Sequence, residues 1–189
     1  MRHKYETRGI VLARAHTGEA TTLVTLLTAD LGLVQARAQS LRKSGAKLSS
    51  SLATFAESSV VLVRGREGWR LSGAVLEENW FARLQDAGEL PRATRVSTLV
   101  LRLVAGEAHD THLFPIMQGF FRALSESPRE LCEAAEVLAG LRSLAALGLD
   151  SGTLPGEASV FSPPLLTEVA ESRAAFIARI NRGITASGL

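Results

Sequence analysis

The sequence predicts an α+β protein, with a small closed barrel of five strands followed by a bundle of about four helices. Up to residue 79 the chain alternates short runs rich in Val, Thr and Gly with polar turns, as strands do. Beyond that point Ala, Leu, Glu and Arg recur at helical spacing. This change of composition predicts two domains, residues 1–79 and residues 80–189.

The predicted barrel consists of short apolar runs separated by turn residues. Polar turns over residues 16–19 and 29–32 separate the first three runs, and residues 65–68 form a hairpin turn before the fifth. A long polar loop separates the third run from the fourth. The runs span residues 6–14, 22–28, 33–38, 59–64 and 68–75. Five strands with a loop between the third and the fourth are typical of an OB-type barrel, which commonly binds oligonucleotides.

The predicted helices begin at prolines and end at glycines or loops. One helix runs from Pro91 through Ala108, and a second spans residues 113–124 with Pro115 in its first turn. A third begins at Ser127-Pro128 and ends at Gly148. A loop marked by Gly and Pro covers residues 150–164, and a last helix is predicted over residues 164–185.

Length and composition limit the class of protein. A chain of 189 residues can bury a real core as one large domain or two small ones. No apolar run is long enough to cross a membrane, and no apolar stretch follows the first charges as in a secretory signal. The single cysteine, Cys132, excludes an internal disulfide and a multi-cysteine zinc site, and we expect it to pack as a small hydrophobe. These features predict a cytoplasmic protein without a metal or other cofactor.

The net charge of +2 conceals a difference between the two parts of the chain. Residues 1–80 hold 11 Lys and Arg against 7 Asp and Glu, whereas residues 81–189 hold 10 Arg against 12 Asp and Glu. Between Asp30 and Glu57 there are four cations and no acidic residue. Such an excess attracts phosphate groups. By charge alone, this stretch is either a nucleic-acid site or a solvated basic loop.

An OB-type barrel that holds a single strand needs cations for the phosphates and flat side chains for the bases. The predicted barrel has three aromatic residues. Phe55 is expected in the core, Trp69 is either exposed or buried, and Tyr5 precedes the first strand. With so few rings, we expect phosphate contacts to dominate and sequence preference to be small. The nucleic-acid-binding candidates are cations of the strands, hairpin and loop: Arg14, Arg37, Arg42, Lys43, Lys47, Arg66 and Arg70.

Motifs that indicate catalysis or metal binding are absent from the sequence. The glycines near the hairpin lack the spacing of a dinucleotide-binding loop, and there is no serine nucleophile elbow. His109 and His112 stand three residues apart, but the sequence places no third ligand, so a polar connection between helices is favoured over a metal site. We therefore expect a protein that is not an enzyme.

The predicted helix over residues 113–124 is unusually apolar. Its Phe, Ile and Met residues exceed one narrow stripe, so either part of the helix is exposed to a partner or all of these residues are core. The partner-binding candidates are the aromatic and Met residues with two nearby cations: Phe114, Met117, Phe121, Arg122 and Arg129.

Several segments of the sequence resemble one bacterial family. Residues 9–12, 18–28 and 31–34 are similar to the amino-terminal domain of the recombination mediator RecO, and residues 113–114 and 141–148 are similar to its helical domain. The resemblance covers about three quarters of the chain. In many members a four-cysteine zinc element follows the long helix. This sequence has only a short loop there, without cysteine, so no metal site can be carried over.

The resemblance implies a non-catalytic mediator in the repair of DNA gaps and breaks. It implies binding of single-stranded DNA, annealing of complementary strands, and recombinase loading together with RecR. It also implies that the helical domain holds the acidic C-terminal tail of single-strand DNA-binding protein, which ends in apolar residues. Two other functions stay open. One is an OB-type module for RNA or tRNA, because a basic loop does not distinguish the sugars, and the other is a protein-interaction scaffold without DNA contact.

Overall fold

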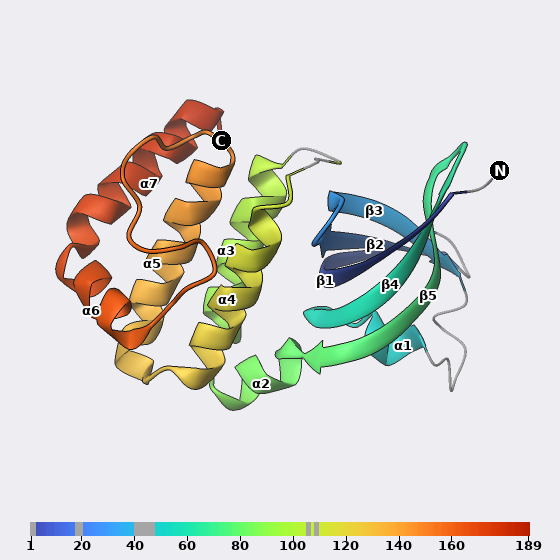
Figure 1. The fold of residues 1–189 in the computed structure, drawn as a ribbon, viewed down its shortest axis with the longest axis horizontal. Helices are drawn as coiled ribbons and strands as arrows, with labels where there is room; N and C mark the ends of the chain where they lie inside the picture. Colours follow the sequence, from blue (N-terminus) through green and yellow to red (C-terminus); the bar gives the residue numbers. More distant parts are fainter. Residues whose placement is uncertain (1–2, 18–20, 40–47, 105–106, 108–109) are drawn as a thin grey trace. The chain divides into compact units, whose positions relative to one another are not determined.

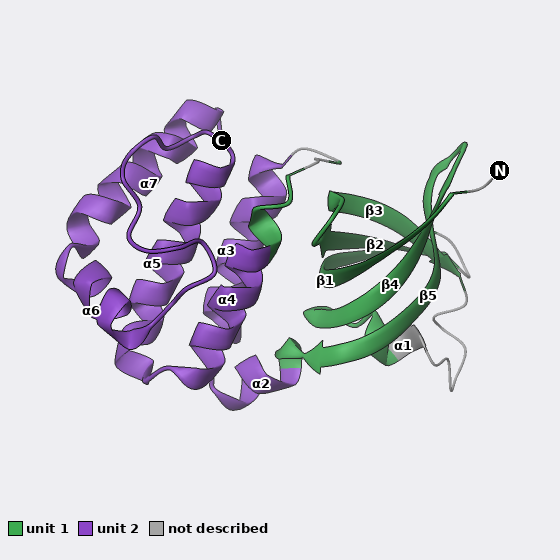
Figure 2. Cartoon of the chain, in the orientation of Figure 1, with its two compact units in different colours: residues 1–81, 106–114 green, residues 82–105, 115–189 purple. Residues whose placement is uncertain are grey.

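The computed structural model describes residues 3–17, 21–39, 48–104, 107 and 110–189. The chain divides into two compact units, which are described separately (Figure 2). The barrel unit comprises residues 1–81 and 106–114, and the helical unit comprises residues 82–105 and 115–189. A short segment after the first long helix is therefore part of the barrel unit.

The barrel unit contains a closed barrel whose strands follow the order β1-β2-β3-β5-β4 (Figure 1). Strands β3 and β5 pair in parallel, and every other neighbouring pair is antiparallel. The strands are β1 (Lys4–His16), β2 (Thr21–Thr28), β3 (Gly32–Gln39), β4 (Ala56–Gly65) and β5 (Gly68–Asn79). This five-stranded arrangement confirms the predicted OB-type fold in an α+β chain.

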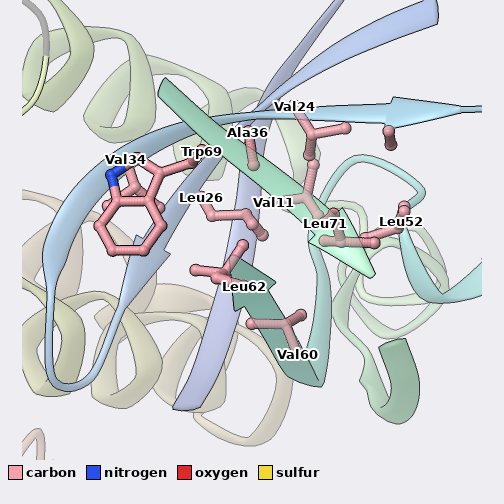
Figure 3. Packing of buried hydrophobic residues seen from close by; sticks show 11 residues of the cluster. Val11, Val24, Leu26, Val34, Ala36, Leu52, Val60, Leu62, Trp69 and Leu71 are labelled. Carbon is pink, nitrogen blue, oxygen red and sulfur yellow. The ribbon is translucent and has the colours of Figure 1, made fainter. Parts of the chain in front are cut away.

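The barrel encloses an apolar core to which every strand contributes (Figure 3). Along β3, Val34, Ala36 and Ala38 are buried, whereas the residues between them are exposed. This alternation follows from the two-residue period of a strand, and it leaves Arg37 on the outer surface. The core cluster is made up of Val11, Val24, Leu26, Val34, Ala36, Ala38, Leu52, Val60, Leu62, Trp69 and Leu71.

One short element of the barrel unit was not predicted from the sequence. Helix α1 (Leu48–Ser51) lies between β3 and β4, and four residues are too few for helical periodicity to be recognised. After it, Phe55 adopts a left-handed backbone with φ of 61° and donates its N–H to the Val11 carbonyl at 2.8 Å. Its side chain is buried, which confirms the expected core position.

The helical unit is organised around α5 (Arg129–Ala146). The residues of α5 from Val137 to Leu144 are all buried, and the helix packs against α3, α6 and α7. A helix that is hidden on all sides lies at the centre of its domain. The other helices are α2 (Trp80–Asp86), α3 (Leu90–Leu103), α4 (Leu113–Glu126), α6 (Pro163–Glu171) and α7 (Arg173–Ser187). No helix in the described ranges is long and apolar enough to span a bilayer.

The structure corrects two predicted helices. Helix α3 ends at Leu103 rather than Ala108, and Val104 is extended. The helix predicted over residues 164–185 is two helices, α6 and α7, which meet at Ser172. Serine competes locally for backbone hydrogen bonds and so favours helix ends. The described part of the helical unit therefore has five helices of nine residues or more instead of about four.

Candidate nucleic-acid interface

Part of the predicted nucleic-acid site is gathered at the β4–β5 hairpin. Arg42, Lys43 and Lys47 lie outside the described residues. Of the remaining candidates, Arg37 on β3, Arg66 in the hairpin turn and Arg70 on β5 lie together at the place where β3 and β5 close the barrel. With Arg64 on β4, these four residues form the arginine cluster.

The short β3–β5 pairing places two arginines side by side. Ala36 is the register partner of Trp69, and Arg37 is the register partner of Arg70. Because side chains alternate across a strand, the buried pair points into the barrel and the two arginines point outward. Like charges at directly opposite positions of a sheet are unfavourable, so an anion between them would relieve repulsion.

The hairpin turn holds one of these arginines in place. Gly65 and Gly68 close a two-residue turn formed by Arg66 and Glu67, and Gly68 has φ of 95°, which favours glycine. The Arg37 guanidinium donates to the Glu67 carbonyl and to its carboxylate, each at 3.0 Å. Arg66 and Arg70 have no carboxylate partner in the part of the chain that the structure describes.

Aromatic residues lie beside the cluster, and the structure decides the position of Trp69. Only 9% of Trp69 is exposed, so of the two alternatives it takes the buried one. The Arg64 guanidinium carbon lies 4.9 Å from its ring centroid, and Tyr5 meets it edge-on with centroids 5.2 Å apart. Arg64 also donates to the Glu107 carboxylate at 2.9 Å. The sequence did not indicate that Tyr5 and Arg64 both pack on Trp69, because Tyr5 is distant from the other two residues along the chain.

Arg14 is separate from the arginine cluster. It lies on β1 in register with Val24 of β2. Its Nε is buried and has no hydrogen-bond partner among the described residues. The structure therefore brings together three of the predicted cations and places a fourth elsewhere on the barrel.

The residues that could bind a metal do not form a site in the described part of the chain. No group of three or more His, Cys, Asp or Glu residues is gathered there. The His112 ring nitrogen Nδ1 lies 3.3 Å from the Asp110 carboxylate, and His109 lies outside the described residues. Cys132 is buried as a small hydrophobe, as predicted, and burial raises the pKa of its thiol to about 11. A single protonated thiol cannot supply the several thiolates of a multi-cysteine zinc site.

The apolar excess of α4 is explained by burial. Phe114, Met117 and Phe121 are exposed by 3%, 0% and 0%, so the alternative with an exposed apolar face does not hold in this structure. Arg122 and Arg129 are exposed, but the aromatic residues expected to accompany them are inaccessible. A helix with an apolar surface wider than one stripe is buried on more than one side.

An apolar groove that the sequence did not reveal lies between α3, α5 and α7. This helical groove has a volume of 370 Å³. Each of the three helices contributes only part of its lining, so the residue pattern of no single helix indicates it. Its apolar lining consists of Val96, Leu99, Val137, Gly140, Ile177 and Ile180. Three arginines stand at its rim: Arg92, Arg95 and Arg173.

Carboxylates partly neutralise the rim of the helical groove. Arg92 and Arg95 donate to Glu136 at 2.7 Å and 2.5 Å, and Arg173 donates to Glu133 at 2.5 Å. Burial opposes ionisation of Glu136, but the hydrogen bonds from the two arginines outweigh it and hold its pKa below the ordinary value. The rim keeps three positive and two negative side chains.

Comparisons with known proteins agree with this architecture. Residues 1–79 match the family model described as "Recombination protein O N terminal". A "DNA repair protein RecO" of Dehalococcoides mccartyi (strain ATCC BAA-2266 / KCTC 15142 / 195) is 31% identical over 132 residues, 69% of this chain and 52% of the relative. The chain belongs to the RecO family.

Two further RecO relatives align past the barrel into the helices. The "DNA repair protein RecO" of Gloeobacter violaceus is 30% identical over 144 residues, 76% of this chain and 55% of the relative. The protein of the same name from Gloeothece citriformis is 29% identical over 126 residues, 67% of this chain and 44% of the relative. The chain thus spans about half the length of the curated RecO relatives it matches.

Proposed function

We propose that this chain is a non-catalytic mediator of DNA repair whose barrel binds single-stranded DNA chiefly through phosphates. The observation that supports this most is the adjacent, exposed pair Arg37 and Arg70, with Arg66 next to them on the hairpin. Two guanidinium groups in register can follow successive phosphates of a flexible strand. Such contacts give affinity with little sequence preference.

The cations between β3 and β4 in the sequence would add further phosphate contacts to those of the arginine cluster. Arg42, Lys43 and Lys47 follow β3 directly in the sequence, and β3 carries Arg37. We infer that a DNA single strand held by the arginine cluster continues onto these three cations. Annealing of complementary strands and recombinase loading with RecR are the roles that we infer by similarity to the family.

Salt dependence tests the phosphate contacts of the cluster and the loop separately. Replacing Arg66 and Arg70 by Ala should weaken single-strand binding and lower the slope of log affinity against log salt by roughly 1.4, at about 0.7 per contact. Replacing Arg42, Lys43 and Lys47 by Ala should lower it by roughly 2. Arg102→Ala removes an exposed arginine of α3 and is the matched control. An unchanged slope in both sets would exclude the barrel as the DNA-binding surface.

A competition experiment separates the other two functions. An RNA- or tRNA-binding module would prefer RNA over single-stranded DNA of the same length, because recognition of RNA uses the 2′-hydroxyl. A protein-interaction scaffold would bind neither. We expect single-stranded DNA to compete better than duplex DNA or RNA.

We further propose that the helical groove, rather than α4, holds the C-terminal tail of single-strand DNA-binding protein. The tail is acidic and ends in apolar residues, and the groove offers an apolar floor with three arginines at its rim. Rim charges add little individually, whereas a buried apolar contact adds more. Holding the coat protein raises the effective concentration of the weak DNA contacts on the barrel.

Calorimetry with the tail peptide tests this placement. We expect micromolar binding that weakens with salt and is abolished by removing the terminal apolar residue of the peptide. Ile177→Asp should abolish binding by placing a carboxylate on the groove floor, whereas Val160→Asp, at an exposed site outside the groove, should not. Arg122→Ala, on α4 itself, serves as a second control. Loss of binding in Arg122→Ala with retention in Ile177→Asp would return the site to α4.

A further inference from the structure

One aromatic ring of the barrel keeps a substantial exposed surface beside the arginine cluster. Tyr5 lies near the start of β1 and is 38% exposed. The other rings of the strands and their connections, Phe55 and Trp69, are buried. A flat ring left in solvent next to cations is the arrangement that single-strand-binding surfaces use for bases.

The structure fixes the orientation of the Tyr5 ring. Its centroid lies 5.2 Å from that of Trp69 at an interplanar angle of 79°, which is the favourable edge-to-face geometry. Trp69 belongs to the barrel core and is covered further by Arg64. Because Trp69 cannot move freely, it holds Tyr5 in place and lowers the entropy cost of ordering the ring on binding.

One arginine of the cluster contacts the same tryptophan as this ring, because Tyr5 and Arg64 both pack on Trp69. Tyr5 is the register partner of the core residue Leu62, and Arg64 is two residues further along β4, so their side chains share one face of the sheet. Arg64 is paired with Glu107, and its side chain is still 48% exposed. A phosphate next to a base stacked on Tyr5 would therefore meet the positive charge of Arg64.

We propose that Tyr5 is a base-stacking subsite, which accepts one unpaired nucleobase while the arginine cluster holds the adjacent phosphates. The subsite rests on the proposed single-strand binding by the barrel, and it adds a contact that duplex DNA cannot make. Stacking is tolerant of sequence because every base has an aromatic face. The subsite therefore discriminates single strands from duplexes without reading sequence.

An abasic oligonucleotide isolates the contribution of stacking from that of charge. A thymidine oligonucleotide and an abasic one of equal length, about 15 residues, carry the same phosphates but differ in their bases. Wild-type protein should bind the thymidine oligonucleotide about tenfold more tightly. Tyr5→Phe should keep this ratio, whereas Tyr5→Leu, which retains an apolar contact with Trp69, should bring the ratio close to one. The salt slope should not change in Tyr5→Leu, because no phosphate contact is lost.

Each outcome of this experiment is decisive. Equal binding of both oligonucleotides by the wild-type protein overturns the subsite but leaves phosphate binding by the barrel intact, and this result needs no variant. A thymidine preference that survives in Tyr5→Leu moves base stacking to another residue and also overturns the proposal. Absence of binding to either oligonucleotide overturns both the subsite and the proposed function.

Discussion

Each unit contains an arginine–carboxylate pair that joins distant parts of the chain, and the two pairs differ in how far water reaches them. In the helical unit, Arg179 of α7 binds Asp150 at the start of the loop after α5, with side chains only 16% and 10% exposed. In the barrel unit, Arg37 binds Glu67 with side chains 50% and 87% exposed. An exposed pair contributes about 0–1 kcal/mol, because water and salt screen it.

The difference indicates which arginines a ligand can use. A phosphate can replace Glu67 beside Arg37 at little cost, since that carboxylate is already solvated. Arg179 also donates to the Thr153 carbonyl, so replacing Asp150 would release part of the loop. Shielded arginines therefore stabilise the fold, whereas the exposed arginines of the barrel are free to exchange partners.

Arg142 is the extreme case among the shielded arginines, and its removal should give the largest effect. It is 1% exposed, donates to the carbonyls of Pro155, Ala158 and Val160 at 2.6–3.0 Å, and stacks on Phe161. Burial lowers the pKa of Arg142 to about 10, so the guanidinium remains charged at neutral pH. Arg142→Met leaves three carbonyl groups without their donor and should lower the free energy of unfolding in urea by about 3–5 kcal/mol.

A second variant on the same helix provides the comparison for Arg142. Arg129 is exposed at the start of α5, so Arg129→Met should change the free energy of unfolding by no more than about 0.5 kcal/mol. A loss below about 1 kcal/mol in Arg142→Met would show that the loop over residues 150–162 is held by other contacts. One such contact is the close approach of Ser159 to Gly119, where a Cβ would lie 2.3 Å from the Ser159 carbonyl oxygen.

The Asp150–Arg179 pair should make stability depend on pH in the acid range. Hydrogen bonding from Arg179 holds the pKa of Asp150 below its ordinary value in the folded protein. The ionised carboxylate therefore stabilises the fold above the unfolded pKa of about 4, and this contribution is lost as the pH falls through the lower folded pKa. Asp150→Asn should be less stable by about 1–3 kcal/mol at pH 7 and should show a flatter decline below pH 4 in urea unfolding. Parallel declines of both proteins would mean that the pair does not contribute.

The sequence predicted the barrel better than the helices for a physical reason. The predicted strands are short apolar runs bounded by turn residues, so all five were recognised, with ends within three residues or so on most strands. Helix α1 has too few residues for a period, and the break at Ser172 interrupts a continuous apolar pattern without Gly or Pro. Local composition could not indicate either feature.

The candidate sites were less predictable because they depend on pairings between distant strands and helices. The sequence indicated Arg37, Arg66 and Arg70 by charge alone, but their proximity follows from the parallel closure of β3 on β5. Exposure of α4 could not be decided from its own residues, since burial depends on what packs around it. Arg142 carries the same guanidinium group as the arginines at the rim of the helical groove. Its structural role comes from the hydrogen bonds that it donates to the loop over residues 150–162, and its own position in the sequence does not reveal them.

The exposed pair in the barrel should give the smallest change in stability and a gain in DNA binding. Glu67→Gln removes the carboxylate charge beside Arg37 but keeps the backbone carbonyl that Arg37 also binds. The free energy of unfolding should change by less than about 0.5 kcal/mol, since the pair is solvated. Affinity for single-stranded DNA should rise about two- to threefold at low salt, because a phosphate no longer competes with Glu67. Glu168→Gln on α6 removes the same charge far along the chain and controls for net charge. If Glu67→Gln weakens DNA binding and Glu168→Gln does not, the carboxylate positions Arg37 for the phosphate and does not compete with it.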